Sequence, residues 1–271
     1  MRLDPEAAAA GFRLATHEVL PSTNAAALQH AVEHDGDTPP LWLVAREQTE
    51  GRGRRGNGWI SPPGNLYGTL LLLEPAPRRA PELSFVAALA VHDAIGERAP
   101  MLADRLALKW PNDVLCDGKK LAGILLEGRM RAEKITVAIG IGVNCLHHPS
   151  HTTYPATDLT AAGAHVSAEE LFTVLSATML RRLTQWRSGA GFPGVRADWL
   201  ARAVGIGETL RVRLPDRELF GRSEGLDASG CLSLRLADGR LQTIAAGEVF
   251  PLTGGAEPWF HHKQMAANGA E

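Results

Sequence analysis

The sequence predicts an α/β (α+β) protein, in which a mixed sheet with flanking helices is followed by a small C-terminal β-barrel. Two observations support this architecture. Strand patterns alternate with patterns of helical periodicity as far as residue 204. After Gly205 the pattern changes to short alternating strands separated by turn residues, which is typical of a small β-barrel. We therefore predict domains over residues 1–204 and 205–254, followed by a disordered tail over residues 255–271.

The elements of the first domain follow from local signals. A helix is expected to begin at Ser22-Thr23-Asn24, because short polar side chains can accept hydrogen bonds from the free amides of a first turn. Apolar residues at helical spacing predict helices over residues 82–98 and, after a Ser167/Glu170 capping box, over residues 168–186. Apolar runs predict strands over residues 41–45, 66–73, 105–109, 112–116, 119–126 and 134–141. In the second domain, strands are expected over residues 209–214 and 232–236.

Composition narrows the class of protein. The 271 residues, of which 45% are apolar and 21% charged, suffice for a large buried core. The net charge of -2 provides no general attraction to nucleic acid or to anionic membranes, so we expect neither as a partner. Cys116, Cys145 and Cys231 lack the spacing of a zinc or redox site, which indicates a reducing compartment. Without a signal-peptide pattern or a membrane-spanning segment, the protein is expected to be cytoplasmic.

The most informative stretch is residues 109–113, Lys-Trp-Pro-Asn-Asp, followed by an Asp117-Gly118 turn and by Lys-Lys-Leu-Ala-Gly at residues 119–123. Asp-Gly between two apolar-rich runs is a strong hairpin signal, so lysines, an amide and a carboxylate are expected together. Such groups suit polyphosphate and carboxylate chemistry. Without other motifs, the two lysines after the turn could simply decorate a hairpin surface, and Asn112-Asp113 could only shape the strand after Pro111.

Residues 51–56, Gly-Arg-Gly-Arg-Arg-Gly, match the spacing of a dinucleotide-binding fingerprint but fail the requirements of both common nucleotide loops. A Rossmann loop must open a helix, and Pro62-Pro63-Gly64 leaves no room for one. A P-loop requires Lys-Ser/Thr where this chain has Asn57-Gly58. What remains is either a mobile loop whose guanidiniums close over an anionic ligand, or a solvated arginine loop.

Together with Ile139-Gly140-Ile141-Gly142-Val143-Asn144, these motifs resemble biotin protein ligase, well over residues 17–145 and loosely beyond. The resemblance implies a catalytic domain similar to class II aminoacyl-tRNA synthetases and an SH3-like C-terminal domain, in a class I ligase without a DNA-binding domain. It also implies an enzyme that uses ATP and Mg²⁺ to activate biotin as biotinyl-5′-AMP. The biotin would then pass to a lysine of the biotin carboxyl carrier protein of acetyl-CoA carboxylase or a related carboxylase.

The resemblance further implies roles for individual residues. Lys120 would stabilise the approach of the biotin carboxylate to the α-phosphate. Asp113 would accept a proton from the acceptor lysine, because forming the free amine at neutral pH costs about 4–5 kcal/mol. Arg54, the third catalytic residue, would retain the adenylate. The expected biotin-binding residues are Ser22, Thr23, Asn24, Gln48, Gly51, Arg52, Trp59, Lys120, Gly123, Gly140 and Gly142. The expected ATP-binding residues are Arg52, Arg54, Arg55, Lys109, Asn112 and Asn144.

Several of these residues also have simpler interpretations. Ser22 and Thr23 could only cap a helix, Trp59 could only pack, and a Gly-Ile-Gly strand end is a weak signal by itself. Asn57 stands where the family often has an arginine, which predicts a weaker grip on phosphate. Residues 147–151, His-His-Pro-Ser-His, show no partner at a recognisable ligand spacing, so we expect His147, His148 and His151 to be solvated and assign no metal ligands.

Other functions stay open at this point. A lipoate or octanoate ligase or transferase shares the superfamily fold, although the glycine-arginine loop argues against it. The remaining alternatives are a bifunctional ligase-repressor and a non-catalytic biotin-binding regulator. Repressors carry an additional amino-terminal winged helix-turn-helix of roughly 60 residues. Residues 1–16 precede the first motif here, so no such domain is expected. The acceptor carboxylase and the oligomeric state are left open.

Overall fold

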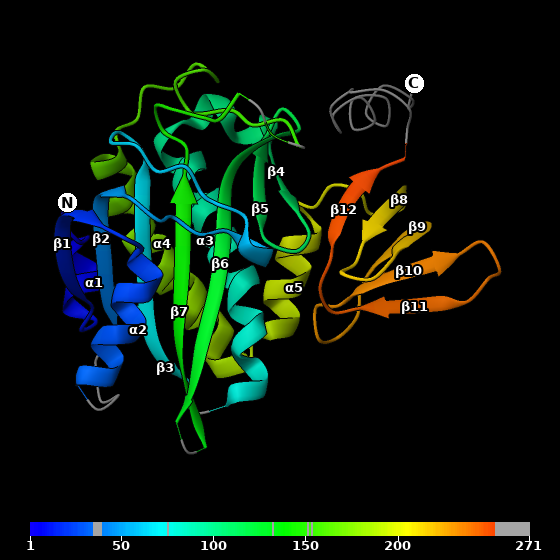
Figure 1. The fold of residues 1–271 in the computed structure, drawn as a ribbon, viewed down its shortest axis with the longest axis horizontal. Coiled ribbons are helices and arrows are strands. Elements are labelled where there is room, and N and C mark those ends of the chain that lie inside the picture. Colours follow the sequence, from blue (N-terminus) through cyan, green and yellow to red (C-terminus); the bar gives the residue numbers. More distant parts are fainter. Residues whose placement is uncertain (35–39, 75, 132, 151, 153, 253–271) are drawn as a thin grey trace.

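The computed structural model describes residues 1–252, apart from residues 35–39, 75, 132, 151 and 153. The predicted tail over residues 255–271 lies outside the described residues. A large sheet with packed helices forms one part of the molecule, and a smaller sheet lies beside it (Figure 1). None of the described helices is long and apolar enough to cross a membrane.

The large sheet contains seven strands in the order β1-β2-β3-β7-β6-β5-β4. β1 and β2 are parallel and the remaining neighbours are antiparallel, which confirms the predicted mixed sheet. The strands are β1 (Arg13–Leu20), β2 (Leu41–Gln48), β3 (Leu66–Glu74), β4 (Leu106–Lys109), β5 (Asp113–Cys116), β6 (Lys119–Arg131) and β7 (Lys134–Val143).

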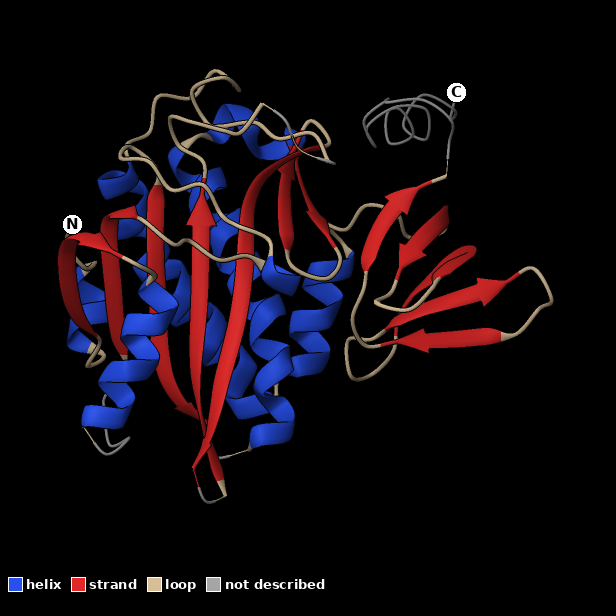
Figure 2. Cartoon of the chain, viewed as in Figure 1, coloured by secondary structure: helices blue, strands red, loops and turns tan. Residues whose placement is uncertain are grey.

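Helices cover the two faces of this sheet (Figure 2). Successive strand residues point to opposite faces, so Leu41 and Leu43 pack under α2 whereas Trp42 and Val44 join the main core on the other face. The predicted capping box of α4 is present, with the Ser167 and Glu170 side chains bonding each other's backbone amides. The helices are α1 (Pro5–Ala9), α2 (Thr23–Glu33), α3 (Leu83–Arg98), α4 (Ala168–Trp186) and α5 (Phe192–Leu200), with 3-10 turns η1 (Arg54–Gly56), η2 (Pro77–Glu82), η3 (Pro100–Arg105) and η4 (Arg187–Gly189).

The smaller sheet is antiparallel and has the order β11-β10-β9-β8-β12, as expected of an SH3-like domain. It packs directly on the first domain. The indole nitrogen of Trp110 donates a hydrogen bond to the Gly230 carbonyl at 3.1 Å, and a Cβ at Gly230 would fall 2.7 Å from the Phe85 ring. The two domains therefore share one continuous core. The strands are β8 (Thr209–Arg213), β9 (Glu218–Leu226), β10 (Leu232–Leu236), β11 (Leu241–Ile244) and β12 (Glu248–Pro251).

Candidate active site

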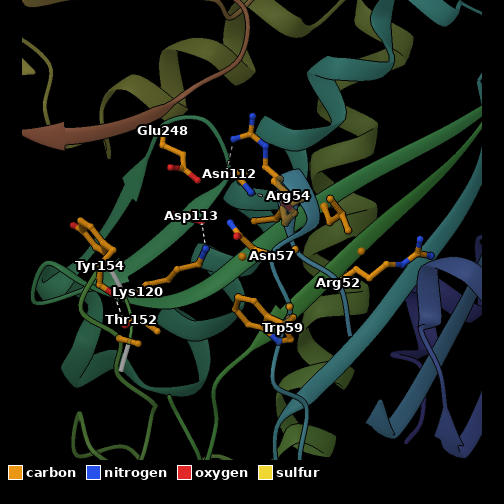
Figure 3. Close-up of a pocket in the computed structure, with 18 of the residues that line it drawn as sticks. Arg52, Arg54, Asn57, Trp59, Asn112, Asp113, Lys120, Thr152, Tyr154 and Glu248 are labelled. Atoms are coloured by element: carbon orange, nitrogen blue, oxygen red, sulfur yellow. Dashed lines mark hydrogen bonds and ion pairs between the residues drawn. The ribbon is translucent and has the colours of Figure 1, made fainter. Parts of the chain in front are cut away.

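A cavity of about 560 Å³ opens between the glycine-arginine loop, the β5–β6 hairpin and β12 of the C-terminal domain (Figure 3). It brings together nearly all of the predicted site residues, which come from five separate parts of the chain, residues 22–24, 48–59, 109–113, 120–123 and 140–144. Two of them, Gly51 and Arg55, do not line it. The predicted residues in its wall are Ser22, Thr23, Asn24, Gln48, Arg52, Arg54, Trp59, Lys109, Asn112, Asp113, Lys120, Gly123, Gly140, Gly142 and Asn144.

A buried carboxylate between two ammonium groups occupies the middle of the cavity. Asp113 begins β5, directly opposite Lys109 at the end of β4, while Lys120 lies in β6 just past the Asp117-Gly118 turn. The Lys120 Nζ lies 2.6 Å from one oxygen of Asp113, and the Lys109 Nζ lies 3.5 Å from the other. The predicted β5–β6 hairpin thus carries Asp113 and Lys120, and β4 adds the second cation, Lys109.

Burial and charge oppose each other in this cluster. Burial alone would raise the pKa of Asp113, but the charges of Lys120 and Lys109 outweigh it and hold the pKa below its usual value. Burial dominates at Lys109 and lowers its pKa, although Asp113 acts in the opposite direction. The Lys109 ammonium also lies 4.0 Å from the ring centroid of Tyr154. Asp113 is therefore ionised at neutral pH and holds two cations in fixed positions.

One end of the cavity, which we call the uncharged end, is lined by the neutral polar side chains of Ser22, Thr23, Asn24 and Gln48. The backbone amide and hydroxyl of Thr23 both donate to the Gln48 Oε1, at 2.8 and 3.1 Å, while the Gln48 amide nitrogen donates to Ser61. Asn24 donates to the Leu125 carbonyl and to Glu127. Ser22 caps α2, as its simpler interpretation requires, and it also lines the cavity.

The buried hydroxyl of Thr69, in β3, supports this end from below. It lies 2.8 Å from the Thr23 hydroxyl and 2.6 Å from the Asn24 Oδ1. Sequence reasoning missed Thr69, because a lone threonine inside an apolar strand carries no signal of its own. The network fixes the side chains that face the cavity.

The Trp59 ring lies close to two glycines of the sheet. A Cβ at Gly142 would fall 2.6 Å from the Trp59 ring and one at Gly123 would fall 3.1 Å from it, while a Cβ at Gly140 would fall 2.4 Å from the Asn24 Oδ1. These glycines, which were expected to bind biotin, therefore allow the close approach of two neighbouring side chains, those of Trp59 and Asn24. The Trp59 ring also lies 5.4 Å from the Lys120 ammonium.

The glycine-arginine loop connects the two domains. The Arg54 guanidinium donates to the Asn112 Oδ1 at 3.2 Å and to the Gly247 carbonyl, which precedes β12, at 3.3 Å (Figure 3). Asn112 in turn donates to the Ile124 carbonyl at 2.6 Å. Arg52 points elsewhere and pairs with Glu127 at 3.5 Å. Arg54 and Arg52 thus lie along different parts of the cavity.

The other loop residues have structural roles. Both terminal nitrogens of Arg55 donate to the Arg213 carbonyl, which anchors the loop to the C-terminal domain instead of directing Arg55 into the cavity. Gly51 is required by the loop itself, since a Cβ there would fall 2.2 Å from the Trp59 carbonyl. Asn144 lines the cavity while its amide donates to the Thr157 carbonyl at 3.0 Å.

Residues remote in sequence complete the wall. Thr152 and Tyr154 come from the segment after β7, and the C-terminal domain contributes Arg213, Gly247, Glu248 and Phe250. None of these was predicted, because their position depends on how the two domains pack and no local pattern encodes that contact.

The histidine-rich segment does not form a metal site in the described part of the chain. His148 is paired with the Asp158 carboxylate, its Nδ1 lying 2.6 Å from the Oδ2. This partner is ten residues away in sequence, and no local pattern indicates the pair. His151 lies outside the described residues. Within the described residues no group of three His, Cys, Asp or Glu side chains could hold a metal ion.

The cavity suits a small ligand that has a neutral polar group at one end and a carboxylate at the other, placed beside a polyphosphate. The uncharged end suits the first ligand, the Asp113 cluster lies in the middle, and Arg54 and Arg213 lie at the other end. This arrangement suits a ligase-type site, in which a carboxylate is joined to a nucleotide.

Comparisons with known proteins agree. Residues 16–144 match the Biotin/lipoate A/B protein ligase family, and residues 205–250 match the biotin protein ligase C-terminal domain. The chain is 44% identical over 237 residues to a biotin–[acetyl-CoA-carboxylase] ligase of Paracoccus denitrificans, across 84% of this chain and 96% of that protein. It is 32% identical to the bifunctional ligase/repressor of Bacillus subtilis, across 84% of this chain and 71% of that protein.

A solved structure shows the same fold. The biotin protein ligase from Aquifex aeolicus in complex with biotin and ATP superposes with a TM-score of 0.70 at 26% identity, covering 88% of this chain and 97% of that one. The chain belongs to the biotin/lipoate protein ligase family, and within it to the biotin protein ligases.

Proposed function

We propose that this protein activates biotin with ATP as biotinyl-5′-AMP and transfers the biotin to a lysine of a biotin carboxyl carrier protein. The observation that carries the proposal is the Lys109–Asp113–Lys120 cluster, which lies between an uncharged polar end and an arginine-rich end of one cavity. Family membership supports biotin as the carboxylate. The proposed acceptor is the carrier protein of acetyl-CoA carboxylase, in the cytoplasm, with no nucleic acid as partner.

In the first half-reaction, a biotin carboxylate oxygen attacks the α-phosphorus of ATP and pyrophosphate leaves. The Lys120 ammonium, held by Asp113, would lie between the two anions and stabilise their approach. Thr23, Gln48 and Asn24 would meet the biotin ring, with Trp59 along its apolar face. Arg54, Lys109 and Asn112 would bind the nucleotide.

Mg²⁺ enters this proposal as part of the substrate, MgATP. The described residues include no group of three metal-ligating side chains, and one of the two carboxylates in the cavity wall, Asp113, is already paired with lysines. This fits a cation that keeps phosphate and water ligands, as Mg²⁺ commonly does. When bound, it would neutralise part of the triphosphate charge.

In the second half-reaction, the neutral amine of the acceptor lysine attacks the acyl carbon of the adenylate and AMP leaves. Asp113 remains our proposed proton acceptor. Its lowered pKa makes it a weaker base than a free carboxylate, so part of its contribution is to position Lys120 and Lys109.

A single assay tests the proposed function against its alternatives. Purified protein is incubated with MgATP, a biotin acceptor domain and either biotin or lipoate, and the acceptor is weighed by mass spectrometry. We expect a mass increase with biotin alone. An increase with lipoate would indicate a lipoate ligase, and no increase despite measurable biotin binding would indicate a non-catalytic regulator.

A further inference from the structure

A guanidinium from the C-terminal domain lies in the cavity wall and has no role in the reaction as described so far. Arg213 ends β8, directly opposite Glu248 at the start of β12. The Arg213 side chain is held by two carboxylates: its Nε lies 3.2 Å from Glu218, and its Nη1 lies 3.8 Å from Glu248. Within the described cavity wall, Arg213 is the one cation that the C-terminal domain supplies.

Arg213 lies at the same end of the cavity as Arg54. Arg54 donates to the Gly247 carbonyl, and the next residue, Glu248, is the cross-strand partner of Arg213. The two guanidiniums therefore flank one short segment, and the Glu248 carboxylate interacts with both of them. Asn57, which follows Arg54 and Arg55 in the loop and also lines this wall, is neutral. The positive charge on this side comes partly from the second domain.

The charge balance of the wall favours a polyanion. Its described residues include five cations and two carboxylates, and both carboxylates are already paired with cations. The cations are Arg52, Arg54, Lys109, Lys120 and Arg213. Arginine binds phosphate through several donors at once, and the 3.8 Å contact to Glu248 is loose enough to be replaced by a closer phosphate.

We propose that Arg213 is a further ATP-binding residue, which contacts the phosphates that leave as pyrophosphate. This inference rests on the proposed function, because it places the α-phosphate beside Lys120 and the rest of the triphosphate toward the arginine-rich end. It makes the C-terminal domain part of the nucleotide site. The substitution of Arg213 leaves its backbone carbonyl, and hence the Arg55 anchor, in place.

The chain offers a matched control on the same strand. Arg211 pairs with the same Glu218 at 3.9 Å, and its guanidinium lies 4.9 Å from the Phe250 ring, compared with 5.1 Å for Arg213. The two side chains are 37% and 39% exposed. Only Arg213 lines the cavity. Any effect on the C-terminal domain itself should therefore be the same in Arg211→Gln and Arg213→Gln.

The experiment measures binding of α,β-methylene-ATP, which cannot release pyrophosphate, and of AMP, which lacks the outer phosphates. We expect Arg213→Gln to weaken binding of the ATP analogue about tenfold, since a charge-assisted contact to phosphate is lost. AMP affinity and the KM for biotin should change less than twofold, and Arg213→Lys should recover part of the loss. Arg211→Gln should match the wild type in each measurement.

Three results would overturn the assignment: equal losses in the Arg211 and Arg213 variants, equal losses for the ATP analogue and AMP, or no loss at all. Failure of the proposed function would look different, because the wild-type protein would then make no biotinyl-5′-AMP from biotin and ATP. Thermal unfolding of each variant checks that the C-terminal domain is intact.

Discussion

Burial alone would disfavour the ionised form of Asp113. The side chain stays ionised because each of its two oxygens faces a lysine. A buried charge cluster of this kind is costly to desolvate and contributes little to net stability compared with an apolar core. Its value is positional, because it holds the Lys120 ammonium at a fixed point of the cavity. In the proposed reaction Lys120 is therefore expected to carry the chemistry, and Asp113 to fix its position.

Lys120→Ala should slow adenylation far more than it weakens biotin binding. The ammonium is needed where two anions converge, whereas the biotin ring is held at the uncharged end of the cavity. We expect pyrophosphate release to fall about 10²–10³-fold, as for the loss of one preorganised electrostatic contact. Biotin titration should show a much smaller change. Lys119→Ala, at the exposed neighbouring position, is the control and should leave both measurements unchanged.

Asp113→Asn should destabilise the protein by about 3–5 kcal/mol at neutral pH, because it leaves the buried Lys109 ammonium without a counter-charge. The pKa of Asp113 is lowered in the folded state, so its contribution is complete above the unfolded value of about 3.9 and is lost as the pH falls through the folded value. Urea unfolding should therefore show a large difference in the free energy of unfolding between wild type and variant at pH 7, and a smaller difference in acid. Adding Lys109→Met should recover stability at pH 7, and no recovery would contradict the pairing.

The same variant tests whether Asp113 is a base. If it accepts the acceptor lysine's proton, Asp113→Asn should slow transfer from preformed adenylate more than it slows adenylation, and higher pH should restore part of the transfer rate. If Asp113 only positions the lysines, both half-reactions should slow alike and the loss should not respond to pH. Rates are compared at a temperature where the variant is folded.

At the scale of elements, local signals predicted the site's framework and missed its surroundings. The β5–β6 hairpin was predictable because Asp-Gly is a preferred sequence for hairpin turns in which both residues have positive φ. Asp117 and Gly118 adopt φ of 49° and 70°, as such a turn requires. β1 was not predicted, because it is an edge strand whose residues are mostly exposed or half-buried and show no apolar run. Glu248 and Phe250 reach the cavity only through contacts between domains, which no local pattern encodes.

Gly142→Ala should weaken biotin binding about tenfold. Its Cβ would fall 2.6 Å from the Trp59 ring, so the ring must move away from the sheet, and overpacking of this kind costs about 1–3 kcal/mol. Titration calorimetry with biotin measures the loss. Gly96→Ala, in α3, is the control, because a Cβ there meets nothing within 4 Å and should raise stability by about 0.5–1 kcal/mol without affecting biotin. Unchanged biotin affinity in Gly142→Ala would contradict this role of the Trp59 ring.

At the scale of the whole molecule, the cavity depends on both domains and on the glycine-arginine loop, which belongs to the first domain and hydrogen-bonds to the second. Arg54 bonds Asn112 in the catalytic domain and the Gly247 carbonyl in the C-terminal domain, and Arg55 bonds the Arg213 carbonyl. The loop is thus tied at one side to the hairpin that carries Asp113 and at the other to β8 and β12. Closure over the reactive adenylate and docking of the C-terminal domain are expected to be coupled.

Arg54→Gly should therefore still make biotinyl-5′-AMP but release it. The change removes the loop's contacts to Asn112 and to Gly247 together and leaves only Arg55 to hold the loop to the C-terminal domain, while Lys120 and Asp113 remain in place. Released adenylate is a mixed anhydride that acylates any accessible lysine, so a bystander protein in the reaction should become biotinylated. Streptavidin blotting measures this, with Arg211→Gln as a control that removes a C-terminal guanidinium outside the cavity. Labelling confined to the carrier domain, or a complete loss of adenylate, would show that Arg54 does not retain the intermediate.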